Sequence, residues 1–375
     1  MNIRYLTAGE SHGKALISII EGIPKGLKLD IGFINRELKR RMMGFGRGKR
    51  MRIEKDTVDI LSGVRGGKSL GSPIALLIKN KDFKIEKLHS ISSPRPGHAD
   101  LAGALKFNEK DIRNILERAS ARETAARVAT GAIFKMLLGE FGTDFVGHVI
   151  SIGGVESKKR LTFARTKAIS EKSPVRCVDR VASREMCAEI RKAAKAGDSL
   201  GGIFEVIAKG VTPGLGSYIQ WDKRLDANLA RAVMSIPGVK GVEVGAGFGV
   251  AGSRGSLVHD EIGYNRSSKK FTRNTNNAGG IEGGISNGEN IVLRGAMKPI
   301  ATLAKPLRSV NIKTKKEVKA QVERADVSVL PAVAVISESL VAIEIARAMS
   351  EKFGGDSLGE MKRNYESYMK VAKSI

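Results

Sequence analysis

The sequence predicts a single α+β domain with layered helices and strands, and three observations carry this prediction. The chain has 375 residues with 42% hydrophobic content, which is enough to bury a large core. Strand-like runs alternate with helical patterns, but without a regular strand-helix-strand rhythm, which disfavours a doubly wound parallel sheet. No linker or low-complexity block divides the chain, and its 43 glycines are spread throughout. We therefore expect one continuous unit over residues 1–375.

The individual elements follow from apolar periodicity. Short β-rich runs predict strands, and longer segments with a 3.6-residue period predict helices. The expected strands are Ile3 to Leu6, Asp56 to Leu61, Ala75 to Ile78, Phe204 to Ala208, Val239 to Val244 and Ile291 to Leu293. The expected helices are Ile34 to Met43, Lys110 to Phe141, Arg184 to Ala196, Leu225 to Met234 and Val333 to Phe353.

Targeting and cysteine patterns predict a cytoplasmic protein with no membrane partner. The chain contains no run of about 18 apolar residues, and Met1 to Arg4 leads straight into a strand without a signal pattern. Cys177 and Cys187 lie without metal-type spacing, so we expect reduced, packing thiols and no metal site.

The net charge of +25, from 64 basic against 39 acidic residues, predicts an anionic partner. A nucleic acid is one alternative, which steep weakening of binding by salt would reveal. The aromatic content of 5%, with a single Trp, argues against a stacking platform for single strands. Strongly anionic small molecules are the other alternative.

A glycine-rich run resembling a dinucleotide-binding motif follows one expected strand. Gly247 to Gly252 fits GxGxxG after Val239 to Val244. The motif should open a helix, but Ser253 to Ser256 continues with loop character, and no strand-end acid follows about 20 residues later. We do not expect a dinucleotide fold.

The turn Gly9 to Gly13 is the first candidate functional segment. It places Glu10, Ser11 and His12 side by side between two glycines, directly after an expected strand. Glycines permit a tight turn and close approach of the backbone to a ligand. A solvated loop is the alternative.

An arginine-rich stretch is the second candidate. Arg40-Arg41 and the segment Gly44 to Arg52 place at least five guanidiniums in a glycine-rich region. The planar guanidinium suits carboxylate and phosphate, so the stretch predicts a bound polyanion. An RNA-binding arm is the alternative, although the stretch lies between an expected helix and strand and contains one aromatic residue.

Two further segments combine charge with a constrained backbone. In Arg95 to Asp100, proline and glycine fix a turn that exposes His98, and an imidazole can transfer a proton near neutral pH. Arg118 to Thr124 lies inside an expected helix and places its charges on more than one face.

These segments together resemble a known family. Nine collinear motifs resemble those of chorismate synthase along nearly the whole chain: GESHG, GRG-K-R-M, RPGHAD, ERASARETAARVATGA, GDSLGG, WDKRLDA, AGGIEGGISNG, MKPIATL and RADVSVLPA. The resemblance implies a βαβ sandwich core and a homotetramer. It also implies a lyase of aromatic amino acid biosynthesis.

Members of this family eliminate phosphate from 5-enolpyruvylshikimate 3-phosphate by 1,4-anti elimination, giving chorismate, with reduced FMN and no net redox change. The substrate's two carboxylates and phosphate agree with the independent prediction of a polyanion. Whether NADPH or an external reductant reduces the FMN stays open, although no extra reductase domain is visible. A flavin-binding regulator without catalysis is disfavoured because His12, His98 and Asp326 are all present.

The resemblance assigns roles by motif position. His12 corresponds to the histidine that protonates or steadies the reduced flavin, and His98 to the one that protonates the departing phosphate. Ser11 and Ser120 resemble serines that assist Asp326 in relaying the substrate C6 proton through flavin N5. The positions matching substrate contacts, two of which also match NADPH contacts, are Arg41, Arg47 and Arg50.

The resemblance also implies the flavin contacts. They are Arg118, Ala119, Ser120, Pro237, Gly238, Gly283, Lys298, Pro299, Ile300, Ala301, Thr302 and Arg324. Two departures stand out: Ala325 replaces a more usual His or Ser, and Pro237-Gly238 replaces a polar-Ala pair. Neither removes a proposed catalytic group.

Overall fold

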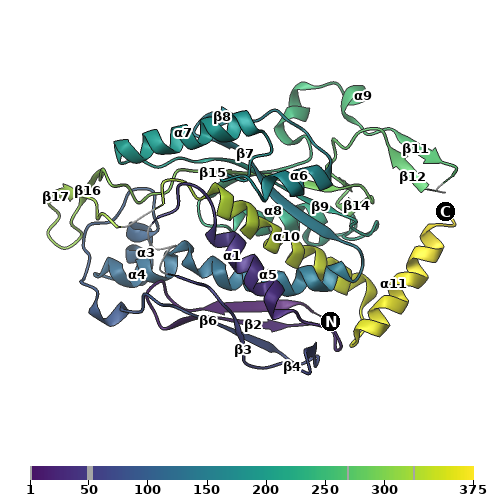
Figure 1. Cartoon of the computed structure of the whole chain (residues 1–375), viewed down its shortest axis with the longest axis horizontal. Coiled ribbons are helices and arrows are strands. Elements are labelled where there is room, and N and C mark those ends of the chain that lie inside the picture. The colour runs from purple at the N-terminus through teal and green to yellow at the C-terminus, as the bar shows by residue number, and fades with distance from the viewer. Residues whose placement is uncertain (1, 49–53, 268–269, 324–325) are drawn as a thin grey trace.

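Two antiparallel sheets enclose a layer of helices in the computed structural model, which describes residues 2–48, 54–267, 270–323 and 326–375 (Figure 1). The smaller sheet has the order β1-β2-β6-β3, with β1 Arg4–Ala8, β2 Ala15–Glu21, β6 Ile74–Lys79 and β3 Asp59–Ile60. The larger has the order β10-β15-β9-β7-β8, with β10 Val239–Val244, β15 Ile291–Met297, β9 Gly202–Lys209, β7 Asp144–Ile152 and β8 Val155–Glu156. Every strand ladder between described residues is antiparallel.

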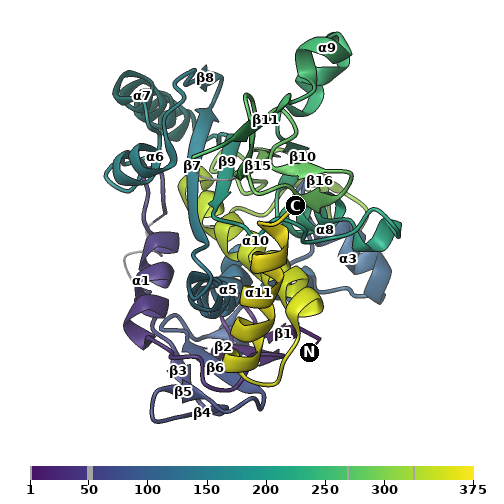
Figure 2. The same ribbon diagram turned by 90° about the vertical axis from the view of Figure 1, so that its right-hand side faces the viewer.

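The helical layer explains why the two sheets stay together. Helix α5 (Thr124–Gly139) packs on the smaller sheet, and α10 (Leu330–Phe353) packs on both α5 and the larger sheet (Figure 2). Both helices are apolar around most of their circumference, which is typical of buried helices. Helix α1 (Ile31–Met42) lies beside them, and α8 (Leu225–Met234) supports β10. This arrangement confirms the expected α+β sandwich.

The remaining elements surround this core. Helices α6 (Phe163–Ser170) and α7 (Arg180–Ala196) pack at the β8 edge of the larger sheet. The other helices are η1 Ile85–Lys87, α3 Asp100–Phe107, α4 Ile112–Ala119, η2 Ala121–Glu123, α6 Phe163–Ser170, α7 Arg180–Ala196, η3 Trp221–Lys223, η4 Gly247–Gly252, α9 Gly255–Val258 and α11 Leu358–Ala372. The hairpins are β4 Val64–Arg65 with β5 Lys68–Ser69, β11 Ile262–Asn265 with β12 Lys270–Arg273, β13 Ile281–Glu282 with β14 Ile285–Ser286, and β16 Arg308–Val310 with β17 Glu317–Lys319.

The prediction of one continuous helix over residues 110–141 is wrong. The segment 110–141 is not continuous, because Ser120 is extended (φ −69°, ψ 138°) and its hydroxyl accepts a hydrogen bond from the Arg122 N–H at 3.3 Å. Ser120 therefore separates α4 from η2 and α5, and acts as an N-cap. Its neighbours lie at a junction between helices rather than on a helix face.

The other expected elements lie where the sequence placed them, with shifted ends. Helix α8 has the expected bounds, whereas α7 begins at Arg180 because the Asp179 carboxylate caps it through the Val181 N–H. The expected strand 56–61 is reduced to Asp59–Ile60. Both cysteines are free and buried, which confirms their packing role.

Two features are absent from the described residues. No helix among them is both long and apolar enough to span a bilayer. The same residues contain no grouping of three or more His, Cys, Asp or Glu side chains placed to hold a metal ion.

Candidate active site

His12 lies in the turn between β1 and β2, and a buried carboxylate fixes it. Glu117, on α4, accepts hydrogen bonds from the His12 backbone N–H at 2.8 Å and from ring Nδ1 at 3.0 Å. The other ring nitrogen, Nε2, is 3.7 Å from the Asp82 carboxylate. A carboxylate on Nδ1 selects the tautomer and the orientation of an imidazole. The turn therefore presents Nε2 as the chemically available nitrogen.

Glu117 is ionised because of these contacts. Burial alone would raise the pKa of this carboxyl group, but hydrogen bonds from the side chain and backbone of His12 lower the pKa below its ordinary value. Arg113, one helical turn away, adds a positive charge at 3.7 Å. The pair is thus an ionised carboxylate beside an imidazole.

The end of α4 also clamps the backbone of the His12 turn. Arg118 donates to the carbonyl oxygens of Gly9 and Thr7 at 2.8 and 2.9 Å. The Ser11 N–H donates to the carbonyl oxygen of Glu117 at 2.9 Å. The sequence-predicted residues Ser11, His12 and Arg118 are thereby brought together.

A second group of predicted residues forms a buried arginine cluster at the end of α1. Arg41 is 4% exposed and donates to the Thr124 hydroxyl at 3.0 Å and to the Ala121 carbonyl oxygen at 3.1 Å. Arg122 donates to Asp56 at 2.7 Å, and Asp56 also lies 3.6 Å from Arg41. One carboxylate is thus shared between two buried guanidiniums.

The electrostatics of this cluster favour an additional anion. Burial, together with the nearby charges of Arg122 and Arg47, lowers the pKa of Arg41 to about 9 despite the opposing charge of Asp56. Arg41 Nη1 and Arg122 Nη2 are buried without a hydrogen-bond partner among the described residues. Buried donors without acceptors are unfavourable, so a ligand with several acceptor oxygens fits here.

Asp326 reaches this cluster from the segment that precedes α10. Its carboxylate lies 3.1 Å from Arg47 Nε and accepts a hydrogen bond from the Gly48 N–H. Arg47 also donates to the carbonyl oxygen of Arg41 at 3.3 Å. The structure therefore brings Arg41, Arg47 and Asp326 together. Predicted residues Arg50 and Arg324, and the departure at Ala325, lie outside the described residues.

His98, in the turn before α3, has its own carboxylate. Its Nδ1 lies 2.6 Å from Asp100 Oδ1, and Arg95 holds Asp100 through Nε at 2.8 Å and Nη2 at 2.9 Å. The hydrogen bonds from Arg95 and His98 keep the pKa of Asp100 well below its ordinary value, although burial opposes them. Arg95 Nη2 also lies 3.0 Å from His98 Nδ1 and 3.4 Å from Nε2. The short contact with an ionised carboxylate favours a proton on Nδ1, which makes Nε2 the nitrogen that could take up and release a second proton.

Most of the predicted flavin contacts gather beside His98. The side-chain Nζ of Lys298 donates to the Gly97 carbonyl oxygen. The backbone N–H of Lys298 donates to the Gly238 carbonyl oxygen at 3.0 Å. The Thr302 hydroxyl accepts a hydrogen bond from Arg95 at 2.9 Å. The segment Lys298 to Thr302 and the turn Pro237-Gly238 are thus placed next to the His98 turn.

Gly283 is the predicted residue that stands apart. It lies between β13 and β14, where the adjoining Gly284 carbonyl oxygen accepts from the N–H of Leu225, the first residue of α8. Pro237-Gly238 follows the other end of that ten-residue helix, about 15 Å away along its axis. Within one chain, Gly283 belongs to a different region from Gly238.

Sequence reasoning missed the side chains that hold the predicted residues. Asp56, Asn80, Arg95 and Glu117 were not among the expected site residues. Asn80 accepts from Arg122 and donates to the backbone of the His12 turn, joining the arginine cluster to that turn. The only local signal was that Arg95 and Glu117 lie inside the quoted motifs.

The glycine-rich run Gly247 to Gly252 takes no part in this site. It forms the short helix η4 and lines a separate pocket of about 400 Å³ that also contains Asp260 and Glu282. Asp260 already accepts the N–H groups of Asn277 and Ala278. Two acids in the pocket oppose phosphate binding, which agrees with the expectation of no dinucleotide fold.

The antiparallel α+β sandwich holds two carboxylate-supported histidines and a buried arginine cluster, which is a set of groups suited to an enzyme that performs acid–base chemistry on a polyanionic ligand. A family model described as chorismate synthase matches residues 3–350. The chain belongs to the chorismate synthase family, and it is therefore a lyase of the shikimate pathway to aromatic amino acids.

Individual relatives agree over the full length. The chain is 52% identical to a chorismate synthase of Geobacter sulfurreducens, with 100% of both chains covered. It is 51% identical to one of Acidobacterium capsulatum, with 98% of each covered. A crystal structure of chorismate synthase superposes with a TM-score of 0.83 at 44% identity, covering 100% of this chain and 99% of the other.

Proposed function

We propose that this chain eliminates phosphate from 5-enolpyruvylshikimate 3-phosphate to give chorismate, with reduced FMN bound beside the substrate. The observation that carries the proposal is the pairing of two histidines with ionised carboxylates, together with a buried cluster of arginines that Asn80 joins to the His12 turn. The histidines supply proton donors, and the arginines supply the positive charge that a substrate with two carboxylates and a phosphate requires.

The substrate's anionic groups would be held by Arg41, Arg47 and Arg122. Arg41 Nη1 and Arg122 Nη2 are buried and make no hydrogen bond among the described residues; they lie 3.6 Å from Asp56 and 3.8 Å from Glu54, too far for one. A carboxylate or phosphate placed between them would satisfy both and would counter the mutual repulsion of the three guanidiniums. Arg50 joins this proposal on motif position alone.

The residues beside His98 fit a flavin phosphate. Burial and the nearby ammonium of Lys240 lower the pKa of Lys298, and a bound phosphate would reverse that shift. Thr302 accepts from Arg95, so its hydroxyl hydrogen is free to donate to a phosphate oxygen. Bound reduced FMN supplies electron density to the substrate ring during the elimination.

The protein's own part in the reaction is to hold and move protons. With a proton on Nδ1 toward Asp100, His98 would act as the acid in its imidazolium form and would give its Nε2 proton to the departing phosphate. His12, between Glu117 and Asp82, would steady the reduced flavin. Ser11, Ser120 and Asp326 would assist removal of the C6 proton, and Arg47 and the Gly48 N–H orient the Asp326 carboxylate.

An anaerobic assay tests the proposal. Chorismate formation is measured from 5-enolpyruvylshikimate 3-phosphate, with photoreduced FMN in one arm and FMN plus NADPH in the other. We expect product in the first arm, and product in the second only if the chain reduces its own flavin. Product in neither arm would refute the proposed function.

We also propose a homotetramer in the cytoplasm. The outer face of the smaller sheet supports self-association, because Leu6 and Ile19 are cross-strand partners with exposed fractions of 57% and 45%. Sedimentation of the full chain would test the assembly, and a monomer at micromolar concentration would contradict it. The buried free thiols suit a reducing compartment.

A further inference from the structure

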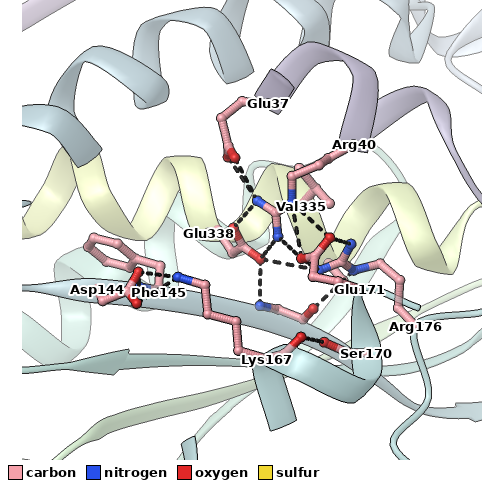
Figure 3. Close-up of polar contacts among 12 residues, drawn as sticks. Glu37, Arg40, Asp144, Phe145, Lys167, Ser170, Glu171, Arg176, Val335 and Glu338 are labelled. Atoms are coloured by element: carbon pink, nitrogen blue, oxygen red, sulfur yellow. Dashed lines mark hydrogen bonds and ion pairs between the residues drawn. The ribbon is translucent and has the colours of Figure 1, made fainter. Parts of the chain in front are cut away.

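A cluster of six charged side chains is enclosed where α1, α5, α10 and β7 meet, away from both histidines (Figure 3). Its members are three carboxylates and three cations: Glu37, Glu171, Glu338, Arg40, Lys135 and Arg176. We call it the Glu338 cluster. The function proposed above does not use any of these residues.

Glu338 is the fixed point of the cluster. It is fully buried on α10, and the Gly147 N–H of β7 donates to its Oε1 at 2.6 Å. Arg40 donates to both of its oxygens at 2.8 Å, and Lys135 of α5 donates to Oε2. Contacts from three other elements therefore leave Glu338 one orientation.

Arg40 is fully occupied by carboxylates. Besides its two bonds to Glu338, it donates through Nε to Glu171 at 3.1 Å and through Nη1 to Glu37 at 2.9 Å. The sequence treats Arg40 and Arg41 as equal members of an anion-binding stretch, which is wrong for Arg40. Its guanidinium holds the helix and has no donor to spare for a ligand.

Arg41 is the next residue of α1, about 100° further around the helix. Its guanidinium contacts Thr124, Ala121 and Asp56, within the proposed anion site. The two arginines lie in the last turn of α1, so a rotation that released Arg40 would displace Arg41. The loop after α1 carries Arg47, which donates to the Arg41 carbonyl oxygen and would shift with it.

Stability alone does not account for such a cluster. Buried ion pairs are often no better for stability than apolar side chains of similar volume, because desolvation offsets their attraction. The bidentate contact of an arginine with a carboxylate instead fixes the relative orientation of the two side chains. The cluster fixes one rotational setting of α1.

We propose that Arg40 and Glu338 are positioning residues for the substrate-binding arginines. The pair sets the rotation of α1 so that Arg41 and Arg47 converge on the substrate's anionic groups. This inference rests on the proposed function, since it takes Arg41 as a substrate contact.

The test compares two matched substitutions in the full chain, each assayed anaerobically with photoreduced FMN. Arg40→Lys keeps the charge but loses the fork, and we expect the KM for 5-enolpyruvylshikimate 3-phosphate to rise about tenfold with kcat within about threefold. Arg176→Lys makes the same change in a residue that contacts Glu171 and Glu338 but does not belong to α1. We expect Arg176→Lys to lower the melting temperature similarly and to leave KM unchanged.

Three outcomes would overturn the inference. One is an unchanged KM in Arg40→Lys, and another is an equal rise in both variants, as a merely structural role predicts. If Arg40→Lys does not fold, Glu338→Gln replaces it and is judged by the same split between KM and kcat. Arg41→Lys is the reference: if it leaves KM unchanged, the proposed anion site itself fails and the inference fails with it.

Discussion

Glu117 accepts hydrogen bonds from both the backbone N–H and the ring Nδ1 of His12, 105 residues earlier in the chain. The Glu117 carboxylate thus holds the backbone of the turn and also orients the His12 imidazole, with Nδ1 toward Glu117. Neither residue alone would mark this site, because a glycine-flanked histidine and a helical glutamate are both common. Their contact occupies Nδ1 and leaves Nε2 as the ring nitrogen on the side away from Glu117.

Glu117→Gln tests that relationship. The amide keeps the size of the side chain but removes the negative charge, so we expect kcat to fall about 10- to 100-fold, as for other residues that orient a functional imidazole. Asp82→Asn is the control, because Asp82 lies farther from His12, at 3.7 Å. Steady-state kinetics with photoreduced FMN would measure both. Equal, small losses would show that His12 does not depend on Glu117.

His98→Ala tests the proton donor. Loss of a general acid typically costs 100-fold or more, so we expect at least about a 100-fold fall in kcat with reduced FMN supplied. His89→Ala is the matched control, since His89 is exposed and bonds Arg113 through its backbone carbonyl oxygen, which the substitution keeps. Turnover of His98→Ala within about threefold of the parent would rule out the assigned role.

Two glycines of α5 test the packing of the helical layer. A Cβ at Gly131 would lie 2.3 Å from Ser339 Cβ on α10, whereas a Cβ at Gly139 meets nothing within 4 Å. We expect Gly131→Ala to destabilise the chain by about 2 to 3 kcal/mol and Gly139→Ala to stabilise it by about 0.5 kcal/mol. Urea unfolding measures both. A neutral Gly131→Ala would mean that α5 and α10 are not in close contact.

The two cross-strand contacts of Glu205, with His148 and with Arg294, predict a pH dependence of stability. Burial would raise the pKa of Glu205, but hydrogen bonds from His148 and Arg294 lower it from 4.5 to about 2. A carboxyl group whose pKa is lower in the folded state than in the unfolded state stabilises the protein at pH values above the unfolded-state pKa. This stabilisation is lost as the pH falls, here between pH 4.5 and pH 2. The loss should reach about 3 kcal/mol.

Urea unfolding at a series of pH values checks this. In Glu205→Gln, that part of the pH dependence should be absent, whereas exposed Glu156→Gln should retain it. The same slope in the parent and in Glu205→Gln would show that other carboxyl groups cause acid unfolding.

The sequence predicts the class of fold and the regions of the site well, because both depend on local patterns. Apolar periodicity locates α8 and α10, and the motifs locate both histidine turns. Prediction from the sequence fails where a contact made in the folded chain overrides a local preference. Alanine-rich periodicity continues through Ser120, yet Ser120 is extended there and its side chain caps the start of a new helical segment.

Long-range partners explain the remaining errors. Arg40 and Arg41 are indistinguishable in sequence, and only the position of Glu338, 298 residues away, separates a structural arginine from one in the site. Glu338 itself lies in the mostly apolar first half of α10, where its sequence context gives no sign of three cationic neighbours. Asp56 and Asn80 are equally ordinary until Arg122 contacts both.

That separation bears on how the chain matures during synthesis. At roughly 5 to 20 residues per second, about 15 to 60 s pass between translation of Arg40 and of Glu338. During this interval α10 has not been made, so α1 cannot pack against it. The smaller sheet can already pack against α5, which is translated earlier. Residues near the start of the nascent polypeptide must therefore wait for a segment made near its end. Arg41 and Arg47 are among the first residues to leave the ribosome and among the last to reach their working arrangement.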